Sequence, residues 1–160
     1  MGIRTIREMG DDILRKHSKP IKEMTPRIRQ LIADMFETMY DDNGVGLAAP
    51  QVGILKRLFV IDCGDPETLE PRPYVFINPE ILETRGEVTD SEGCLSIPGR
   101  FAPVPRPEWV KVRALDKDMK EFTLEAEGLL ARCICHENDH LDGILYVDKA
   151  TGPVEYVKEE

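Results

Sequence analysis

Residues 128–141 read GLLARCICHENDHL, and this stretch predicts the central helix of the fold. Apolar residues occupy much of its circumference, which is typical of a helix that is buried inside a domain. Gly143 follows closely, and glycine commonly ends a helix. We therefore expect a buried helix over residues 128–141.

The end of this helix carries a pattern of polar residues. His136 and His140 are four residues apart, so they lie on one helix face about 6 Å apart along the axis, and both imidazoles can reach one metal ion. Glu137 is turned by about 100° from His136. It can reach a water molecule beside the metal without binding the metal itself. His-Glu-x-x-His on a helix is typical of metal-dependent hydrolases in which the glutamate is the general base.

A catalytic metal site of this kind needs a third protein ligand and an open position for water. Tyr146 stands where the extended pattern H-E-x-x-H-x-x-G-x-x-H would place a third histidine. Glu155 follows Pro153 near the end of the sequence, where we do not expect it to be held rigidly. His17 lies among charged residues and is expected to be an exposed surface histidine. The third ligand should therefore be sought among the cysteines.

The four cysteines differ as candidates for the third ligand. Cys133 shares the histidine face, but it lies about 7.5 Å along the axis from a metal held by both histidines. That is too far for a metal–sulfur bond of about 2.3 Å. Cys135 points away from this face and Cys63 ends an apolar run, so both are expected to pack as small hydrophobic residues. Cys94 lies in a short polar and glycine-containing segment, where the backbone can approach a ligand closely, and it is the predicted third ligand.

Three motifs occur in a fixed order: GVGLAAPQ at 44–51, EGCLS at 92–96 and HENDH at 136–140. Together they resemble the peptide deformylase family, over about residues 3–148. The resemblance implies an enzyme that removes the N-formyl group from the initiator methionine of nascent polypeptides. It also implies a fold of small sheets around a central metal-bearing helix. The alternatives are a metallopeptidase of the same His-Glu-x-x-His chemistry and a non-catalytic metal- or peptide-binding homologue.

The resemblance also implies roles for individual residues. Glu137 would be the general base. The side chain of Gln51 and the backbone N–H of Leu95 would donate hydrogen bonds to the oxyanion that forms during the reaction. The alternative interpretation of Gln51 is a solvated loop residue. The metal ligands would be Cys94, His136 and His140, and the substrate-binding residues would be Gly44, Val45, Gly46, Leu129 and Cys133. Plain core packing explains the apolar members of the last group equally well. Asp139 either orients a ligand histidine or is a solvated helix aspartate.

The expected cofactor is one divalent metal ion. The resemblance implies Fe(II), with Zn, Ni or Co able to occupy the same site, although the ligands alone would favour Ni or Zn over Fe(II). A thiolate beside iron predicts sensitivity to oxygen. The chain departs from the family at Arg132, often apolar there, and at Cys135, commonly glutamine. We expect the Arg132 stem to line an apolar wall and its guanidinium to reach water.

Composition limits the partners and the compartment. The 160 residues are expected to form a single domain over 1–160, and their net charge of −9 argues against nucleic acid as a general partner. The sequence shows neither a membrane-spanning apolar run nor a signal-peptide core, and its cysteines lack disulfide-framework spacing, so we expect a cytoplasmic protein. The expected partners are N-formylmethionyl peptides. The tail at 154–160 is short and acidic, so we do not expect it to dock on the ribosome as a basic C-terminal helix. A transient contact with the ribosome stays an open alternative.

The remaining elements complete an α+β prediction. Thr25 can cap an amphipathic helix that starts at Pro26 and ends before Gly44. Short strands are predicted at 58–61, 74–77, 87–89, 110–115 and 122–125, with an exposed loop at 65–73. A connector without regular structure is predicted at Pro98, Pro103, Pro105 and Pro107. We therefore expect small antiparallel or mixed sheets packed around the central helix that carries the His-Glu-x-x-His motif, plus the N-terminal amphipathic helix.

Overall fold

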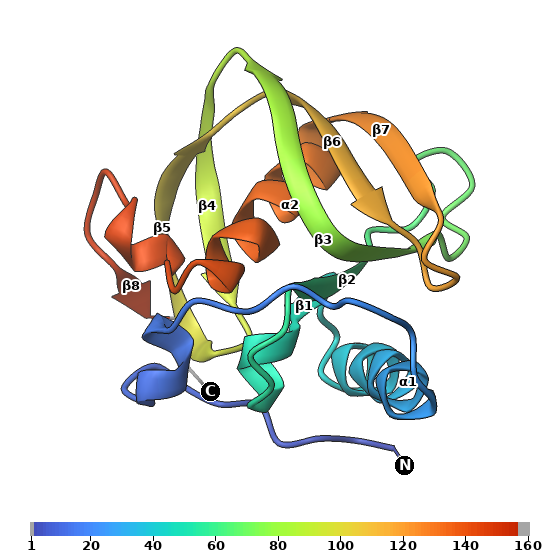
Figure 1. Ribbon diagram of the computed structural model, residues 1–160. Helices are drawn as coiled ribbons and strands as arrows, with labels where there is room; N and C mark the ends of the chain where they lie inside the picture. Colours follow the sequence, from blue (N-terminus) through green and yellow to red (C-terminus); the bar gives the residue numbers. More distant parts are fainter. Residues whose placement is uncertain (1, 157–160) are drawn as a thin grey trace.

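A computed structural model describes residues 2–156 and shows an α+β fold (Figure 1). The described helices are the short η1 (Asp12–Arg15), η2 (Ala49–Val52) and η3 (Tyr146–Asp148), and the longer α1 (Pro26–Asp41) and α2 (Gly128–Leu141). The described strands are β1 (Gly46–Ala48), β2 (Leu58–Asp62), β3 (Pro73–Arg85), β4 (Val88–Cys94), β5 (Ile97–Arg106), β6 (Trp109–Leu115), β7 (Glu121–Glu127) and β8 (Glu155–Tyr156).

The strands form two antiparallel sheets. The larger sheet has five strands in the order β1-β2-β3-β6-β7, and the smaller has three in the order β4-β5-β8. Figure 1 shows α2 in the middle of the molecule, with β3 and β6 on one side and β4 and β5 on the other. The side chains at the end of α2 can therefore meet residues from both sheets.

Helix α2 is held in place by apolar packing against the larger sheet. Ala131, Ile134 and Leu141 are fully buried and share one cluster with Phe59 and Phe76 of the sheet. Each large buried side chain of this kind contributes about 1.5–3 kcal/mol. This packing fixes the rotation of the helix, and with it the direction in which His136 and Glu137 point.

Helix α1 begins and packs as its sequence pattern predicts. The Thr25 hydroxyl accepts a hydrogen bond from the Ile28 backbone N–H at 3.2 Å, and Pro26 is the first helical residue. The buried face packs against β1 and β2 and consists of Ile28, Leu31, Ile32, Met35 and Met39. Because the helix ends at Asp41, the following residues lead directly into β1, which starts at Gly46.

The structure corrects the prediction of an irregular proline-rich connector. Pro98, Pro103 and Pro105 all belong to β5, which pairs with β4 over most of its length, and only Pro107 lies outside the strands as predicted. The paired residues include Ser91 with Pro103 and Thr89 with Pro105. The prediction was wrong because a strand excludes proline only where the ladder needs its N–H group.

The outer side of β5 explains why these prolines are tolerated. The carbonyl of Pro103 accepts a hydrogen bond from the Thr151 N–H at 2.9 Å, on the side away from β4. In an antiparallel pair, alternate residues direct both backbone polar groups away from the partner strand. The nitrogens of Pro103 and Pro105 therefore face outward, and no hydrogen bond to β4 is lost.

The other predicted strands are present, and most are longer than the sequence pattern indicated. The strand predicted at 87–89 continues to Cys94, and the one predicted at 74–77 continues to Arg85. The short strands β1 and β8 were not predicted. Residues 157–160 of the acidic tail lie outside the described residues.

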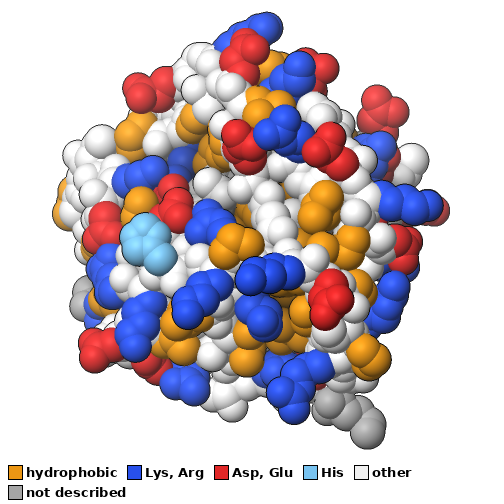
Figure 2. All heavy atoms as spheres, in the orientation of Figure 1, with side chains coloured by type: hydrophobic (Ala, Val, Ile, Leu, Met, Phe, Trp, Pro, Cys, Tyr) orange, Lys and Arg blue, Asp and Glu red, His pale blue; other side chains and the backbone are white. Residues whose placement is uncertain are grey.

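The charge is distributed unevenly over the surface. Although the net charge is −9, Figure 2 shows Lys and Arg side chains gathered on the lower part of one face. Exposed basic residues in the N-terminal segment include Arg15, Lys16, Lys19 and Lys22. No helix in the described part of the chain combines the length and apolar character needed to cross a membrane.

Candidate metal centre and active site

Three potential metal ligands meet beside the end of α2. The sulfur of Cys94, at the end of β4, and the ring nitrogens of His136 and His140 all lie within 4.8 Å of one another. Nε2 of His140 is 3.3 Å from the Cys94 sulfur. The structure therefore brings together the three residues that the sequence singled out as ligands.

The Glu92 carboxylate orients one of these histidines. Its Oε2 lies 2.7 Å from Nδ1 of His136. An ionised carboxylate only accepts hydrogen bonds, so Nδ1 carries the proton and Nε2 keeps its lone pair for a metal. Burial alone would raise the pKa of Glu92, but the bonds from His136 and Arg106 outweigh it and lower the pKa to about 2.

Two arginines complete the surroundings of Glu92. Arg106 is 2% exposed and donates to both carboxylate oxygens, from Nε at 3.1 Å and from Nη2 at 2.6 Å. Arg132 donates to Oε1 at 3.0 Å. A buried carboxylate is stable only when its charge is compensated in this way. The network therefore keeps Glu92 ionised and fixed in position.

Arg132 lines the pocket beside the metal centre, but the structure contradicts the expected position of its guanidinium. Its guanidinium does not reach into water, because it also donates to the carbonyls of Val104 at 3.0 Å and Val88 at 2.7 Å. Only 11% of the side chain is exposed. The buried Glu92 charge attracts the guanidinium inward, and Arg132 thus ties α2 to β4 and β5.

Asp139 takes neither of the two places expected for it. It accepts a hydrogen bond from Arg106 at 2.6 Å and forms an ion pair with Lys149 at 2.9 Å, and its side chain is 13% exposed. It is not a solvated aspartate, and no contact with a histidine is found among the described residues. Its contact with Arg106 makes it a support of the arginine that holds Glu92.

Glu137 is a buried carboxylate at the floor of the site. It is 4% exposed, and its Oε1 has no hydrogen-bond partner among residues 2–156. Its Oε2 lies 3.8 Å from Nε2 of His136. Burial raises the pKa of Glu137 to about 7, with His136 opposing the rise. Such a carboxylate can both accept and return a proton near neutral pH.

Two glycines of the first motif allow the backbone to approach these groups. A Cβ atom at Gly46 would lie 2.6 Å from Oε2 of Glu137, and one at Gly44 would lie 2.6 Å from a methyl carbon of Leu95. Both distances are shorter than van der Waals contact allows. Glycine at these positions therefore lets the loop after α1 lie directly against the catalytic region.

Gln51 is packed against the same centre and is not a solvated loop residue. It is 1% exposed, its Oε1 accepts from the Ala48 N–H at 2.9 Å, and its Nε2 donates to Ser96 Oγ at 3.0 Å. The same Nε2 lies 3.4 Å from the Cys94 sulfur. These contacts direct the amide group toward the metal centre. The sequence alone did not show that Gln51 makes them.

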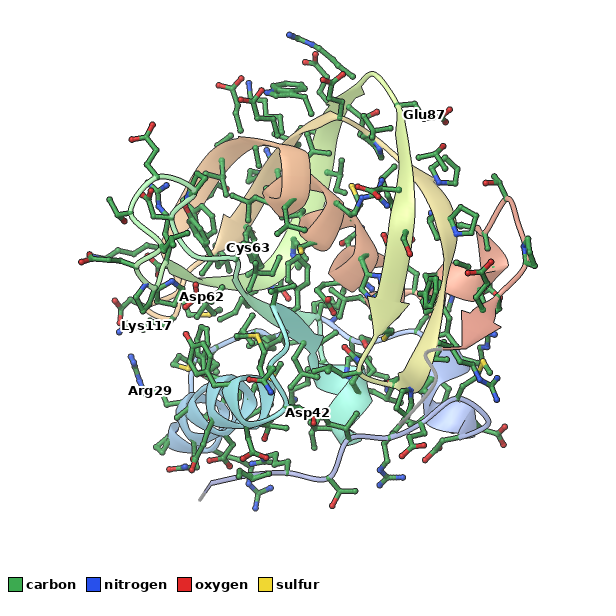
Figure 3. The ribbon with its side chains drawn as sticks, turned by 180° about the vertical axis from the view of Figure 1, so that it is seen from behind. Arg29, Asp42, Asp62, Cys63, Glu87 and Lys117 are labelled. Carbon is green, nitrogen blue, oxygen red and sulfur yellow. The ribbon has the colours of Figure 1, made fainter. Side chains whose placement is uncertain are left out.

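A cavity of about 540 Å³ opens onto these groups. Figure 3 shows Asp42, one of its lining residues, between α1 and the turn that joins β4 to β5. Its wall includes all five predicted substrate-binding residues: Gly44, Val45, Gly46, Leu129 and Cys133. Gln51, Cys94, Leu95, His136 and Glu137 line the same cavity. Val45 is 41% exposed and Leu129 is 55% exposed, so the alternative interpretation that they are core residues is wrong.

The remaining cysteines and His17 lie where the sequence placed them. Cys135 is buried in the main apolar cluster. The Cys133 sulfur lies 3.5 Å from that of Cys63 and is not part of the ligand group. His17 has a side chain that is 78% exposed. The excluded candidates are therefore separate from the metal centre.

Sequence reasoning missed Glu92, Arg106 and the inward position of Arg132. Glu92 stands two residues before Cys94 in a motif that was already recognised, which is the one signal that could have marked it. Its partner His136 is 44 residues away in the chain, and Arg106 is 14 residues away. Such pairings depend on the fold and leave no local pattern.

The residues present fit a divalent transition metal. One thiolate and two imidazoles suit ions such as zinc or iron. The Glu92 contact directs Nε2 of His136 toward the Cys94 and His140 ligand atoms, and a buried oxygen of Glu137 beside them has no partner in the described part of the chain. This is the donor set and the adjacent base that metal-assisted hydrolysis requires.

Comparisons with known proteins agree with this chemistry. The model of the polypeptide deformylase family matches residues 3–155. A peptide deformylase from Lachnoclostridium phytofermentans is 60% identical over 158 residues, covering 98% of this chain and 94% of that protein. A crystal structure of a peptide deformylase from Legionella pneumophila has a TM-score of 0.87 and 48% identity, covering 93% of this chain and 86% of that one.

A further similar structure contains a bound peptide. It is a class I type b peptide deformylase from Acinetobacter baumannii with Met-Ala-Ser bound, with a TM-score of 0.85 and 36% identity over 92% of this chain and 98% of that one. The family match extends over nearly all of the 160 residues. The chain therefore belongs to the polypeptide deformylase family and is an enzyme, a hydrolase of that class.

Proposed function

We propose that this protein removes the N-formyl group from the N-terminal formylmethionine of polypeptides and releases formate. The observation that carries this proposal is the convergence of Cys94, His136 and His140 beside Glu137 at the floor of an open cavity. One buried oxygen of Glu137 has no partner among the residues that the structure describes. The peptide-bound relative from Acinetobacter baumannii supports an N-terminal methionine as the occupant of this cavity.

Cys94, His136 and His140 would hold one divalent metal ion, Fe(II) in the cell, with Zn, Ni or Co able to replace it. When bound, the ion would supply Lewis-acid chemistry, lowering the pKa of a water molecule and polarising the formyl carbonyl. Glu92 keeps Nε2 of His136 directed toward the ligand group. All four cysteines are free thiols, as a reducing compartment such as the cytoplasm would maintain them.

Glu137 moves the proton in the proposed reaction. It takes a proton from the attacking water while the water oxygen forms a bond to the formyl carbon. When the carbon–nitrogen bond breaks, Glu137 gives the proton to the departing amine, and formate leaves with the new oxygen. Its raised pKa of about 7 suits a group that must both accept and donate.

Two donors would stabilise the negative charge on the formyl oxygen. They are Nε2 of Gln51, aimed at the site by its contacts with Ala48 and Ser96, and the backbone N–H of Leu95. A fixed donor placed where charge develops contributes about 3 kcal/mol to catalysis. Because Gln51 is held on both sides of its amide, little reorganisation is needed during the reaction.

The cavity wall would recognise the methionine side chain. Val45, Leu129 and Cys133 present apolar surface, and the exposure of the first two is what a surface covered by substrate would show. The Gly44–Gly46 segment brings backbone close to the substrate path. Residues beyond methionine would extend toward the open side of the cavity.

The test is formate release from formyl-Met-Ala-Ser by protein prepared anaerobically with Fe(II), compared with metal-stripped protein. Release that depends on metal is expected. The unformylated Met-Ala-Ser peptide separates this function from a metallopeptidase, because a peptidase would cleave it and a deformylase would leave it intact. Cleavage of the unformylated peptide without formate release from the formylated one would reject the proposal.

Two variants test the assigned roles. Glu137→Gln should keep the metal, measured by elemental analysis, and lose most of its turnover. Cys94→Ala should lose the metal. Stoichiometric metal in the Cys94→Ala protein, or full turnover in the Glu137→Gln protein, would contradict the corresponding role.

A further inference from the structure

Two cysteines outside the metal centre lie close together. The sulfurs of Cys63 and Cys133 are 3.5 Å apart although the residues are separated by 70 positions in the chain. Cys63 follows the last residue of β2, Cys133 lies within α2, and Figure 3 shows Cys63 between this strand and this helix. Because a disulfide bond is about 2.05 Å long, the two sulfurs need to approach by about 1.5 Å for a bond to form.

The two thiols differ in access and in acidity. Cys63 is half-buried, and Cys133 is 7% exposed. The hydrogen bond between the sulfurs lowers the pKa of the Cys63 thiol, against an opposing effect of burial. The same hydrogen bond and burial raise the pKa of Cys133. Because Cys63 is the more exposed of the two cysteines, it is the thiol of the pair that peroxide reaches first.

We propose that Cys63 and Cys133 form a peroxide-reactive modification site that closes reversibly into an intramolecular disulfide, and that Cys133 connects this site to the wall of the substrate cavity. The Cys63 thiolate attacks a peroxide oxygen, the O–O bond breaks, and a sulfenic acid forms as hydroxide leaves. The Cys133 sulfur then attacks the Cys63 sulfur and water departs, so two thiols and one hydrogen peroxide give one disulfide and two waters. A dithiol reductant reverses the bond by thiol–disulfide exchange.

The position of Cys133 links this modification to the cavity. Cys133 lines the cavity one helical turn before Glu137, and its packing partners are buried residues of α2 and the larger sheet. Disulfide closure draws its sulfur toward Cys63 and fixes α2 to the end of β2. On the proposed function, this reshapes the methionine pocket and leaves Glu137 in place. The expected effect is a fall of about tenfold in kcat/KM, carried by KM.

The remaining cysteines provide a contrast. Cys94 lies 3.3 Å from His140 and is occupied when metal is bound. Cys135 is buried, and burial raises the pKa of its thiol to about 11. No sulfur contact of Cys135 is found within residues 2–156. Cys135 is therefore a matched control, being a cysteine of the same helix that lacks a neighbouring thiol.

The experiment uses full-length protein loaded with Zn(II), which is redox-inactive and keeps Cys94 ligated. Protein is treated with hydrogen peroxide, remaining thiols are alkylated, and unreduced digests are examined by mass spectrometry. The expected product is a linked pair of peptides containing Cys63 and Cys133, with the mass loss of two hydrogens. Dithiothreitol should remove the link and restore both free thiols.

The variants make the result specific. Cys63→Ser should give no linked peptide and should keep its KM after peroxide, whereas Cys135→Ser should behave as wild type in both respects. Cys63→Ala replaces Cys63→Ser if the serine variant does not fold. A thermal unfolding curve shows whether each variant is folded. Wild-type protein in which Cys63 and Cys133 stay unlinked while Cys94 becomes oxidised would overturn the proposal, as would sulfinic acid at Cys63 without a link.

Peptide mapping needs no substrate, so its outcome is independent of the proposed function. Linked peptides from a protein that releases no formate would support the proposed thiol site and reject the proposed deformylase function. Linked peptides with an unchanged KM would reject the effect on the cavity. Absence of the link in an active deformylase would reject the thiol site alone.

Discussion

Nδ1 of His136 lies 2.7 Å from Oε2 of Glu92, and this contact determines which nitrogen of the histidine is available to a metal. In Glu92→Gln the charge on the acceptor is lost, and the pairing with Arg106 is weakened. Loss of such a supporting partner commonly reduces metal affinity by about 10–100-fold. Competition with a chromophoric chelator would measure this change.

The matched control for Glu92 is Asp90→Asn. Asp90 lies on the same strand, is exposed, and bonds to the neighbouring Ser91 N–H. Its replacement should leave metal affinity unchanged. Equal affinities for wild type and Glu92→Gln would show that His136 is oriented without Glu92.

Arg132→Met should destabilise the protein although the side-chain volume is similar. The change removes donors to Glu92, Val104 and Val88, and it leaves a buried carboxylate with less compensation. We expect the free energy of unfolding to fall by about 1–3 kcal/mol. Urea denaturation would measure this, with Arg29→Met as the control.

Arg29 is a suitable control because its half-exposed guanidinium lies 3.4 Å from Asp118 at the surface. Its replacement should change the free energy of unfolding by no more than about 0.5 kcal/mol. If both variants lose the same stability, the buried network around Arg132 contributes nothing beyond a surface ion pair.

Gly46→Ala should impair turnover while the metal stays bound. The added Cβ would lie 2.6 Å from Oε2 of Glu137, so the carboxylate must move or the loop must shift. A displacement of about 1 Å in a catalytic group can reduce the rate by about 100-fold. Steady-state formate release and elemental analysis of the same preparation would test this. Unchanged turnover with unchanged metal content would show that the loop yields and that Glu137 tolerates the substitution.

Asp34 on α1 should make stability depend on pH in the acid range. Burial alone would raise its pKa, but hydrogen bonds from Gln30, the Gly2 N–H and Arg4 lower it to about 2, against 3.8 for the free side chain. A carboxyl group with a lowered folded-state pKa stabilises the protein above its unfolded pKa, and this stabilisation is lost as pH falls toward the folded value. Asp34→Asn should therefore lose about 1–2 kcal/mol at pH 6.

The difference between wild type and Asp34→Asn should shrink as pH is lowered from 4 toward 2. Urea denaturation at several pH values would follow it. A difference that stays constant over this range would mean that Asp34 contributes by shape and packing and not by its charge.

Helical spacing and elimination predicted the helix at 128–141 and singled out the three residues whose ligand atoms lie within 4.8 Å of one another. Both depend on local periodicity, which the sequence displays directly. The Glu92 network, the inward turn of Arg132 and the neighbouring sulfurs of Cys63 and Cys133 depend on which strands pair with which helix. Strand β5 was missed for a related reason. Whether a proline interrupts a strand depends on whether its nitrogen faces the paired strand, and this is known only once the pairing partner is known.

The two prolines of β5 also protect the molecule from its neighbours. A sheet edge with unpaired N–H groups invites a strand from another copy, and edge-to-edge association of this kind leads to aggregation. At Pro103 and Pro105 the outer side of β5 has no N–H to offer, and the Pro103 carbonyl already accepts from Thr151. Strand β8 pairs with β5 only at Arg100 and Phe101, and along the following prolines an incoming strand could not form a continuous ladder, so this stretch of β5 is a poor template for growth.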